Sequence, residues 1–143
     1  MQTANDINQF ATLGNALTEM EDYLNGIEQG CTKLPDAFHT EDKSQPIERT
    51  AQLLEGLVCC QKLFHSAAAL LGINPSGGLW EQASVSSFAS DLNRTCVEIY
   101  DATENEDFSL LADLVEYDLP SVIHTAHELL MAVQQCYRER VEA

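Results

Sequence analysis

Residues 105–120 read NEDFSLLADLVEYDLP, and this stretch decides the fold that the sequence predicts. Its apolar residues recur at three- and four-residue steps, as on one face of a helix; they are Phe108, Leu111, Leu114, Val115 and Leu119. Asn105 can cap this helix, which places Glu106 and Asp107 in its first turn, where exposed amides favour negative charge. Pro120 removes a backbone donor, so we expect a kink or a break there.

The N-terminal third carries the most regular periodicity of the chain. Apolar residues alternate steps of three and four in a single seam, made of Phe10, Leu13, Leu17, Met20, Leu24, Ile27, Cys31 and Leu34. Such a seam is typical of helices that pack at shallow angles. We expect Gly14 and Gly26 to mark close approaches of another helix, and the element to end at Gly30 or at the Leu34-Pro35 step.

A second helix is predicted over about 45–71, with Ser44 as its N-cap and Gly72 after its end. It carries two adjacent apolar seams. One is Leu53, Leu57, Cys60, Phe64, Ala67 and Leu71, and the other is Ile47, Ala51, Leu54, Val58 and Ala68. A stripe this wide indicates contact with more than one neighbour, so we place this helix deepest in the fold.

The rest of the chain predicts two further helices. The third begins near Leu79, or alternatively at Ser84, and runs to about Ala102, with Trp80 and Tyr100 as packing anchors. The fourth starts at the opening stretch and resumes after Pro120 with Val122, Ile123, Ala126, Leu130, Val133 and Tyr137. We therefore predict an all-α protein, a single domain over residues 1–143, folded as an antiparallel four-helix bundle.

Composition limits the partners. The chain has 23 acidic residues against 7 Lys and Arg, a formal charge of −16. Nucleic acid and anionic membrane surfaces are disfavoured, because both need cations on the protein. The start, MQTANDINQF, lacks the features of a signal peptide, and no apolar run reaches the roughly 20 residues of a membrane span. We expect a cytoplasmic protein whose five cysteines are reduced.

Acidic residues on the fourth helix form the candidate partner-binding face, made of Asp113, Glu116 and Asp118. Residues 95–137 contain no Lys or Arg, so nearby sequence offers these charges no cation. The face is either a solvated surface that keeps the protein in solution or a docking site for a basic partner. A calcium loop starting at Asp101 fails, since Glu106 stands where glycine is needed and Ala112 where the bidentate Glu belongs.

Histidines offer a separate metal hypothesis. His124 and His127 share a helix face, and His65 lies in the middle of the second helix. Three histidines from two helices could hold zinc or another divalent ion with an open position. A di-iron site of ferritin type would need Glu three residues before each His, and neither His124 nor His127 has it. Catalytic fingerprints such as G-x-S-x-G and the P-loop do not occur in the sequence.

The segment 102–120, ATENEDFSLLADLVEYDLP, resembles a signature of short bacterial all-helical proteins of uncharacterised function, roughly A-x-E-N-x-D-x-x-L-L-A-D-L-L-E-Y-E-L followed by proline. The matching positions are Ala102, Glu104, Asn105, Asp107, Leu110, Leu111, Ala112, Asp113, Leu114, Glu116, Tyr117 and Leu119. Val115 and Asp118 are conservative departures. The resemblance implies no activity, cofactor or catalytic residue, and it implies that this helix is structurally central.

These observations favour a non-catalytic interaction or adaptor module without a cofactor. Its partner would be a protein, one with a basic surface or a second copy of the chain, because wide apolar stripes often complete their burial across a two-fold axis. The alternative is a metal-dependent enzyme of bundle fold that uses His65, His124 and His127.

Overall fold

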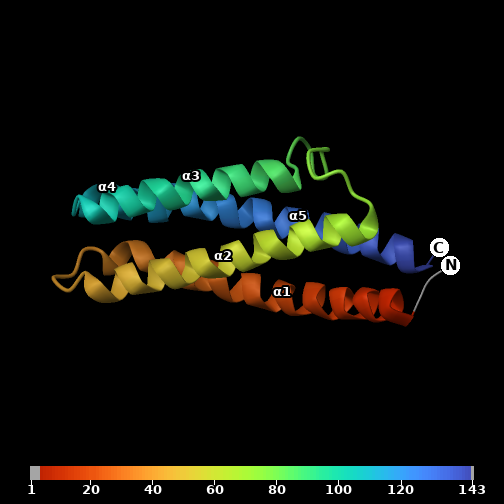
Figure 1. Ribbon diagram of the computed structural model, residues 1–143. Helices are drawn as coiled ribbons and strands as arrows, with labels where there is room; N and C mark the ends of the chain where they lie inside the picture. Colours follow the sequence, from red (N-terminus) through yellow and green to blue (C-terminus); the bar gives the residue numbers. More distant parts are fainter. Residues whose placement is uncertain (1–3, 143) are drawn as a thin grey trace.

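The computed structural model describes residues 4–142 and is all-helical (Figure 1). Its elements are α1 (Ala4–Ala37), α2 (Ser44–Leu71), α3 (Val85–Glu104), α4 (Phe108–Asp113), the π-helical turn η1 (Leu114–Asp118) and α5 (Leu119–Glu142). Because α4, η1 and α5 follow one another without a gap, the fold consists of four helical segments of which the last is long, as predicted. The first three residues of the N-terminal segment, and Ala143, lie outside the described range.

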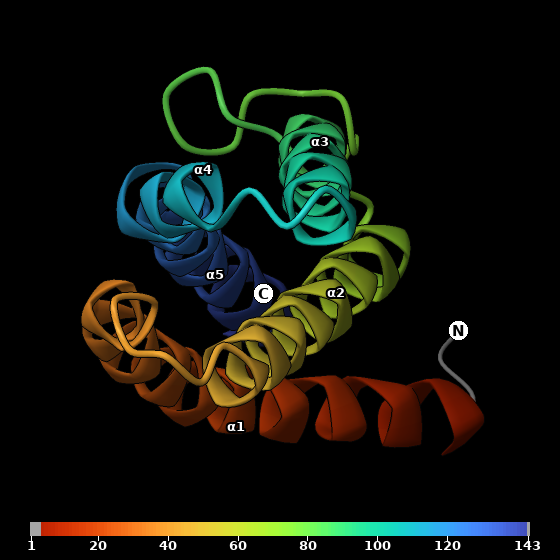
Figure 2. The same ribbon diagram turned by 90° about the vertical axis from the view of Figure 1, so that its left-hand side faces the viewer.

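Helix contacts place α2 and α5 between the other two helices. α1 contacts α2 and α5, and α3 contacts the same two helices. The end-on view shows α1 and α3 on opposite sides of this pair (Figure 2). α2 therefore has three helical neighbours, which agrees with the width of its apolar stripe. The largest fully buried side chains come from every long helix; they are Phe64, Phe88, Leu17, Leu24, Leu34, Leu57, Leu92, Leu111, Leu119, Ile123, Leu129 and Leu130.

Two glycines allow helices to approach closely. A Cβ atom at Gly56 of α2 would lie 2.7 Å from the Tyr23 ring and 2.8 Å from Ile27 on α1. A Cβ atom at Gly14 would lie 2.3 Å from the Tyr137 hydroxyl, which donates a hydrogen bond to the Phe10 carbonyl at 3.0 Å. The prediction for Gly14 is confirmed. That for Gly26 is wrong, because nothing lies within 4 Å of the equivalent position there.

The predicted end of the first helix is wrong. α1 continues through Gly30 and Pro35 to Ala37, and Phe38 just beyond it is only 3% exposed. Proline inside a helix costs about 3 kcal/mol. Burying the Phe38 side chain returns roughly 1.5–3 kcal/mol, and Pro35 lies in the last turn, where few bonds depend on it. The apolar seam therefore extends one step further than the helix-breaking residues suggest.

Two helix starts differ from the sequence prediction, by one residue at α2 and by six at α3. Ser44 is the first residue of α2 rather than its cap, and the Asp42 carboxylate accepts its N–H at 3.0 Å. Leu79 is wrong as the start of α3 and Ser84 is right: Ser84 Oγ accepts from Ser87 N–H at 3.0 Å, and Ser87 Oγ accepts from Ser84 N–H at 2.8 Å.

The cap of α4 is also shifted. Asn105 follows the end of α3, Glu106 takes a left-handed conformation with φ of 53°, and Asp107 caps α4 by accepting the Leu110 N–H at 3.2 Å. Asn105 is thus wrong as the cap, and the acidic residues 106 and 107 precede the helix rather than form its first turn. The reversal between α3 and α4 needs the left-handed residue, and this leaves Asp107 next to the free amides.

The helix is not broken at Pro120; its hydrogen-bond register changes just before that residue. Leu119 N–H donates to the Leu114 carbonyl, five residues back, instead of to Val115 four residues back. In a π-turn the Val115 carbonyl would accept a hydrogen bond from the N–H of residue 120, but residue 120 is proline and has no N–H. The thiol of Cys31 on α1 donates to this carbonyl with an S···O distance of 3.6 Å. Burial, with the charge of Glu28, raises the pKa of the Cys31 thiol to about 11, so it remains a donor at neutral pH.

Leu57→Ala tests the core. Leu57 is fully buried, so its truncation should lower the free energy of unfolding by about 2–5 kcal/mol in urea titration. Leu110→Ala is the control, because Leu110 is 46% exposed and its loss should cost under about 1 kcal/mol. Equal costs at the two positions would contradict the assigned core.

A double-mutant cycle tests the bond between Cys31 and the Val115 carbonyl. Cys31→Ala should cost about 0.5–1 kcal/mol less in a Pro120→Ala background than in wild type, because that background restores a backbone N–H for the carbonyl. Urea unfolding gives both values. Cys60→Ala, at the fully buried thiol of α2, is the matched control and should cost the same in both backgrounds. A Cys31→Ala cost that Pro120→Ala leaves unchanged would rule out the proposed role of the thiol.

Candidate functional site

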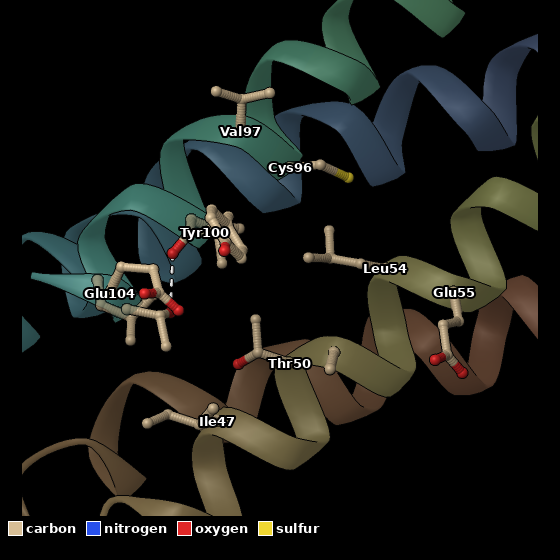
Figure 3. A pocket seen from close by; sticks show the side chains of 12 residues that line it. Ile47, Thr50, Leu54, Glu55, Cys96, Val97, Tyr100 and Glu104 are labelled. Carbon is tan, nitrogen blue, oxygen red and sulfur yellow. Dashed lines mark hydrogen bonds between the residues drawn. The ribbon is translucent and has the colours of Figure 1, made fainter. Parts of the chain in front are cut away.

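An apolar hollow lies between α2 and α3 (Figure 3), and Leu111 of α4 also lines it. Its volume is about 540 Å³, within the range of roughly 300–1,000 Å³ that ligand sites occupy. We call it the α2–α3 groove. Its lining residues are Ile47, Thr50, Ala51, Leu54, Glu55, Cys96, Val97, Ile99, Tyr100, Thr103, Glu104 and Leu111.

The groove exists because α2 and α3 are held together at their other ends. Phe64 of α2 and Phe88 of α3 meet edge to face, with ring centroids 5.4 Å apart. The groove residues of α2 fall between 47 and 55 and those of α3 between 96 and 104, well away from this aromatic contact along both helices. Small Ala51 and the half-buried Leu54 leave the facing surface hollow.

The α2 wall is the second apolar seam predicted for that helix. Of its members, only Ala68 is buried, Ile47, Leu54 and Val58 are half-buried, and Ala51 is exposed. Across the groove, Val97 is 50% exposed and Tyr100 is 64% exposed. Tyr100 is therefore wrong as a packing anchor. The second apolar seam was the only sign of the groove in the sequence. That part of this seam stays uncovered could not be recognised without knowing where α3 lies.

Polar groups in the groove are few, and both of its threonine hydroxyls are engaged. Thr50 Oγ1 donates to the Pro46 carbonyl at 2.7 Å, and Thr103 Oγ1 donates to the Ile99 carbonyl at 2.8 Å (Figure 3, dashed line for the latter). Burial raises the pKa of the Cys96 thiol, which keeps it neutral and unreactive at physiological pH. The remaining charges are the exposed carboxylates Glu55 and Glu104. This arrangement suits the binding of an apolar surface that carries positive charge.

The predicted acidic face lies on a different surface from the groove lining. Asp113 is the last residue of α4, Glu116 and Asp118 belong to η1, and all three are exposed. Asp118 lines a separate hollow of about 340 Å³ together with Arg94 of α3, so a cation from outside the helix does reach its surroundings. Arg94 also pairs with Asp91 at 3.4 Å.

The three candidate metal ligands lie in unlike surroundings. His65 is exposed on α2, with Nδ1 3.0 Å from the Gln61 carbonyl of its own helix. His124 packs edge-on against Trp80, with ring centroids 5.5 Å apart, so the prediction of Trp80 as a packing residue holds although it lies before α3. His127 Nε2 lies 3.1 Å from Glu28 Oε2 of α1, at an angle that makes no hydrogen bond. Within the described part of the chain, no three His, Cys, Asp or Glu side chains gather as metal ligands do.

The length and polarity of the helices test the expectation that the chain contains no membrane span. Over residues 4–142, no helix combines the length and the apolar character that crossing a bilayer requires.

Comparison with curated proteins and with solved structures gives no match. A protein-family model described as "Domain of unknown function (DUF8042)" matches residues 15–129, which is well over half of the chain. The matched span contains the segment 102–120 and every residue that lines the α2–α3 groove. The chain therefore belongs to this family of domains of unknown function.

Proposed function

We propose that the protein is a non-catalytic protein-interaction module, built as an antiparallel four-helix bundle, whose docking surface is the α2–α3 groove. The observation that carries the proposal is the exposure of Val97 and Tyr100 beside half-buried aliphatic side chains of α2. Apolar surface gathered in a concave site is typical of partner binding, whereas isolated exposed apolar residues are ordinary. A partner segment in the groove would bury the apolar side chains of α2 that α3 leaves exposed.

Several features support the bundle and its setting. The connection between α1 and α2 spans only residues 38–43, and short connections join antiparallel neighbours. All five cysteines are free thiols, which fits a reducing, cytoplasmic location. A single domain over residues 1–143 fits a core to which all the long helices contribute.

The groove chemistry favours binding over catalysis. Both threonine hydroxyls already donate to backbone carbonyls, and no histidine is among the twelve lining residues. Nucleophilic catalysis needs an activated nucleophile, and burial instead raises the pKa of the Cys96 thiol. The lining instead offers shape and apolar area.

The acidic face of Asp113, Glu116 and Asp118 has a second role in this proposal. With a net charge of −16, the molecule attracts basic partners over distances of about a Debye length, roughly 8 Å at physiological salt. Exposed charges act mainly on the rate of encounter. The face would steer a basic partner towards the protein, and the apolar groove would retain it.

Photo-crosslinking tests the docking surface. A benzoylphenylalanine residue in place of Tyr100 should give a defined adduct in extract of the source cells. The same photoreactive residue in place of Tyr117, which is 65% exposed on η1 and outside the groove, should not give it. Adding Ala51→Gln should abolish the adduct, because the longer side chain fills the groove from an exposed helix position where it costs little stability.

The identity of the adduct separates the possible partners. An adduct with a second copy of the chain would favour homo-oligomer formation over a basic partner. Equal adducts at positions 100 and 117, or an adduct that survives Ala51→Gln, would contradict docking in the groove.

Asp113→Lys combined with Glu116→Lys tests electrostatic steering. Removing exposed like charges should leave the free energy of unfolding equal or raised by a few tenths of a kcal/mol. The adduct at position 100 should form more slowly than in the parent protein, and its rate should depend less on salt between 50 and 300 mM. Unchanged rates at both salt concentrations would assign the acidic face to solubility alone.

A further inference from the structure

We infer that the occupant of the α2–α3 groove is an amphipathic helix of a partner protein, whose apolar stripe is flanked on each side by Lys or Arg. This inference rests on the proposed function, since it names the partner for the docking surface proposed above. Three properties of the groove carry it: the shape of its walls, the position of its two carboxylates, and the charge of the chain as a whole.

The walls are two helices, and the space between two helices accommodates a third. Residues 47–55 of α2 and 96–104 of α3 each cover about 12 Å along a helix axis, from a rise of 1.5 Å per residue. This length corresponds to a little over two turns of a docked helix. Apolar residues at positions i, i+3 or i+4, and i+7 of the occupant would then face the groove, as in other helix-in-groove complexes.

The two carboxylates lie on opposite walls and at opposite ends. Glu104 stands on α3 at the end of the groove where Ile47 lies, and Glu55 stands on α2 at the other end, on the outer rim, with its side chain directed away from α3 (Figure 3). A helix in the groove would therefore meet one acid on each flank, separated by about 12 Å along its axis. Two basic residues seven or eight positions apart, on opposite flanks of the apolar stripe, match this diagonal.

The chain's own charge argues against a second copy as the occupant. Each copy carries −16, so pairing brings two strongly negative surfaces together. Arg49 of α2, the cation closest in sequence to the groove residues of that helix, lines a hollow between α1 and α2 instead. A neutral apolar helix would fill the groove but leave Glu55 and Glu104 without partners.

Selection from a displayed library of helical peptides provides the test. The full-length protein is the bait, and the Tyr100→Ser variant removes groove-independent binders in a counter-selection. We expect the enriched peptides to carry an i, i+3, i+4, i+7 apolar stripe with Lys or Arg on both flanks, seven or eight residues apart. One enriched peptide then serves as the probe in fluorescence anisotropy titrations.

Salt separates the two contributions to affinity. Glu55→Gln combined with Glu104→Gln should weaken probe binding about tenfold at 50 mM salt and much less at 500 mM, because screening removes exposed pairs. Tyr100→Ser should weaken it about tenfold at both salt concentrations. Glu19→Gln combined with Glu41→Gln is the control of equal charge change at exposed positions outside the groove, and it should leave affinity within about twofold.

Each failure has a separate signature. Enriched peptides that depend on Tyr100 but lack flanking cations, or that bind the glutamine double variant as well as wild type at low salt, would overturn the inference and leave the groove as a docking surface. Selection that yields no peptide sensitive to Tyr100→Ser would overturn both. A dimer in light scattering that Ala51→Gln dissociates would assign the groove to a second copy.

Discussion

The hydrogen bond from the Cys31 thiol to the Val115 carbonyl supplies the donor that this carbonyl loses where the last helix changes register. The Val115 carbonyl is buried. In an α-helix it would accept from Leu119 N–H, but this N–H donates to the Leu114 carbonyl instead, and in a π-helix it would accept from residue 120, which is proline and has no N–H. A buried carbonyl without a donor costs about 1–3 kcal/mol, so the fold needs a donor from elsewhere. A thiol suits this place: it is small and apolar enough for the α1 seam, and its raised pKa keeps its proton.

This contact fixes more than one carbonyl. It sets α1 against η1 at the point where Leu114, Val115 and Leu119 are buried at 6%, 0% and 0% exposure. The short α4 before η1 packs against α3, and its Leu111 lines the α2–α3 groove. Lys43 adds a second contact: its ammonium group donates to the Phe38 and Thr40 carbonyls just beyond α1 and lies 5.7 Å from the centre of the Phe108 ring. α1 therefore contacts η1 and α4, the segments next to the groove, although it does not line the groove itself.

Periodicity predicted the helical class, the number of long helices and most buried positions, because burial on one face is what places apolar residues every three or four positions. It could not predict local ends. Asn105 and Asp107 are equally good caps by type, and only the left-handed Glu106 between them decides in favour of Asp107. The helix continues through Pro35 because Phe38 is buried, which is a tertiary contact. The close approach at Gly56 could not be predicted, because the sequence does not say which helix face meets Tyr23.

The candidate site could be predicted only in part from the sequence. The acidic positions 113, 116 and 118 stood out by charge, whereas the groove needed the second seam of α2 to be recognised as unfilled. The second seam predicts that another helix packs against this side of α2, and α3 does so. The two helices are close near the Phe64–Phe88 contact and leave the groove open further along. The remainder stays open because the α2 wall is built around small Ala51 and the α3 wall presents Val97 and Tyr100 outwards.

The same geometry explains why binding strength and binding rate would reside in different residues. Exposed carboxylates such as Glu116 contribute about 0–1 kcal/mol per pair, since water screens them, but their summed field acts before contact. Apolar area in the groove acts only after contact, at roughly 25 cal/mol per Å² removed from water. A partner recognised by charge alone would bind equally well to any acidic surface of this molecule. Only the groove, whose apolar walls end in Glu55 and Glu104 on opposite sides, adds a requirement for shape and register.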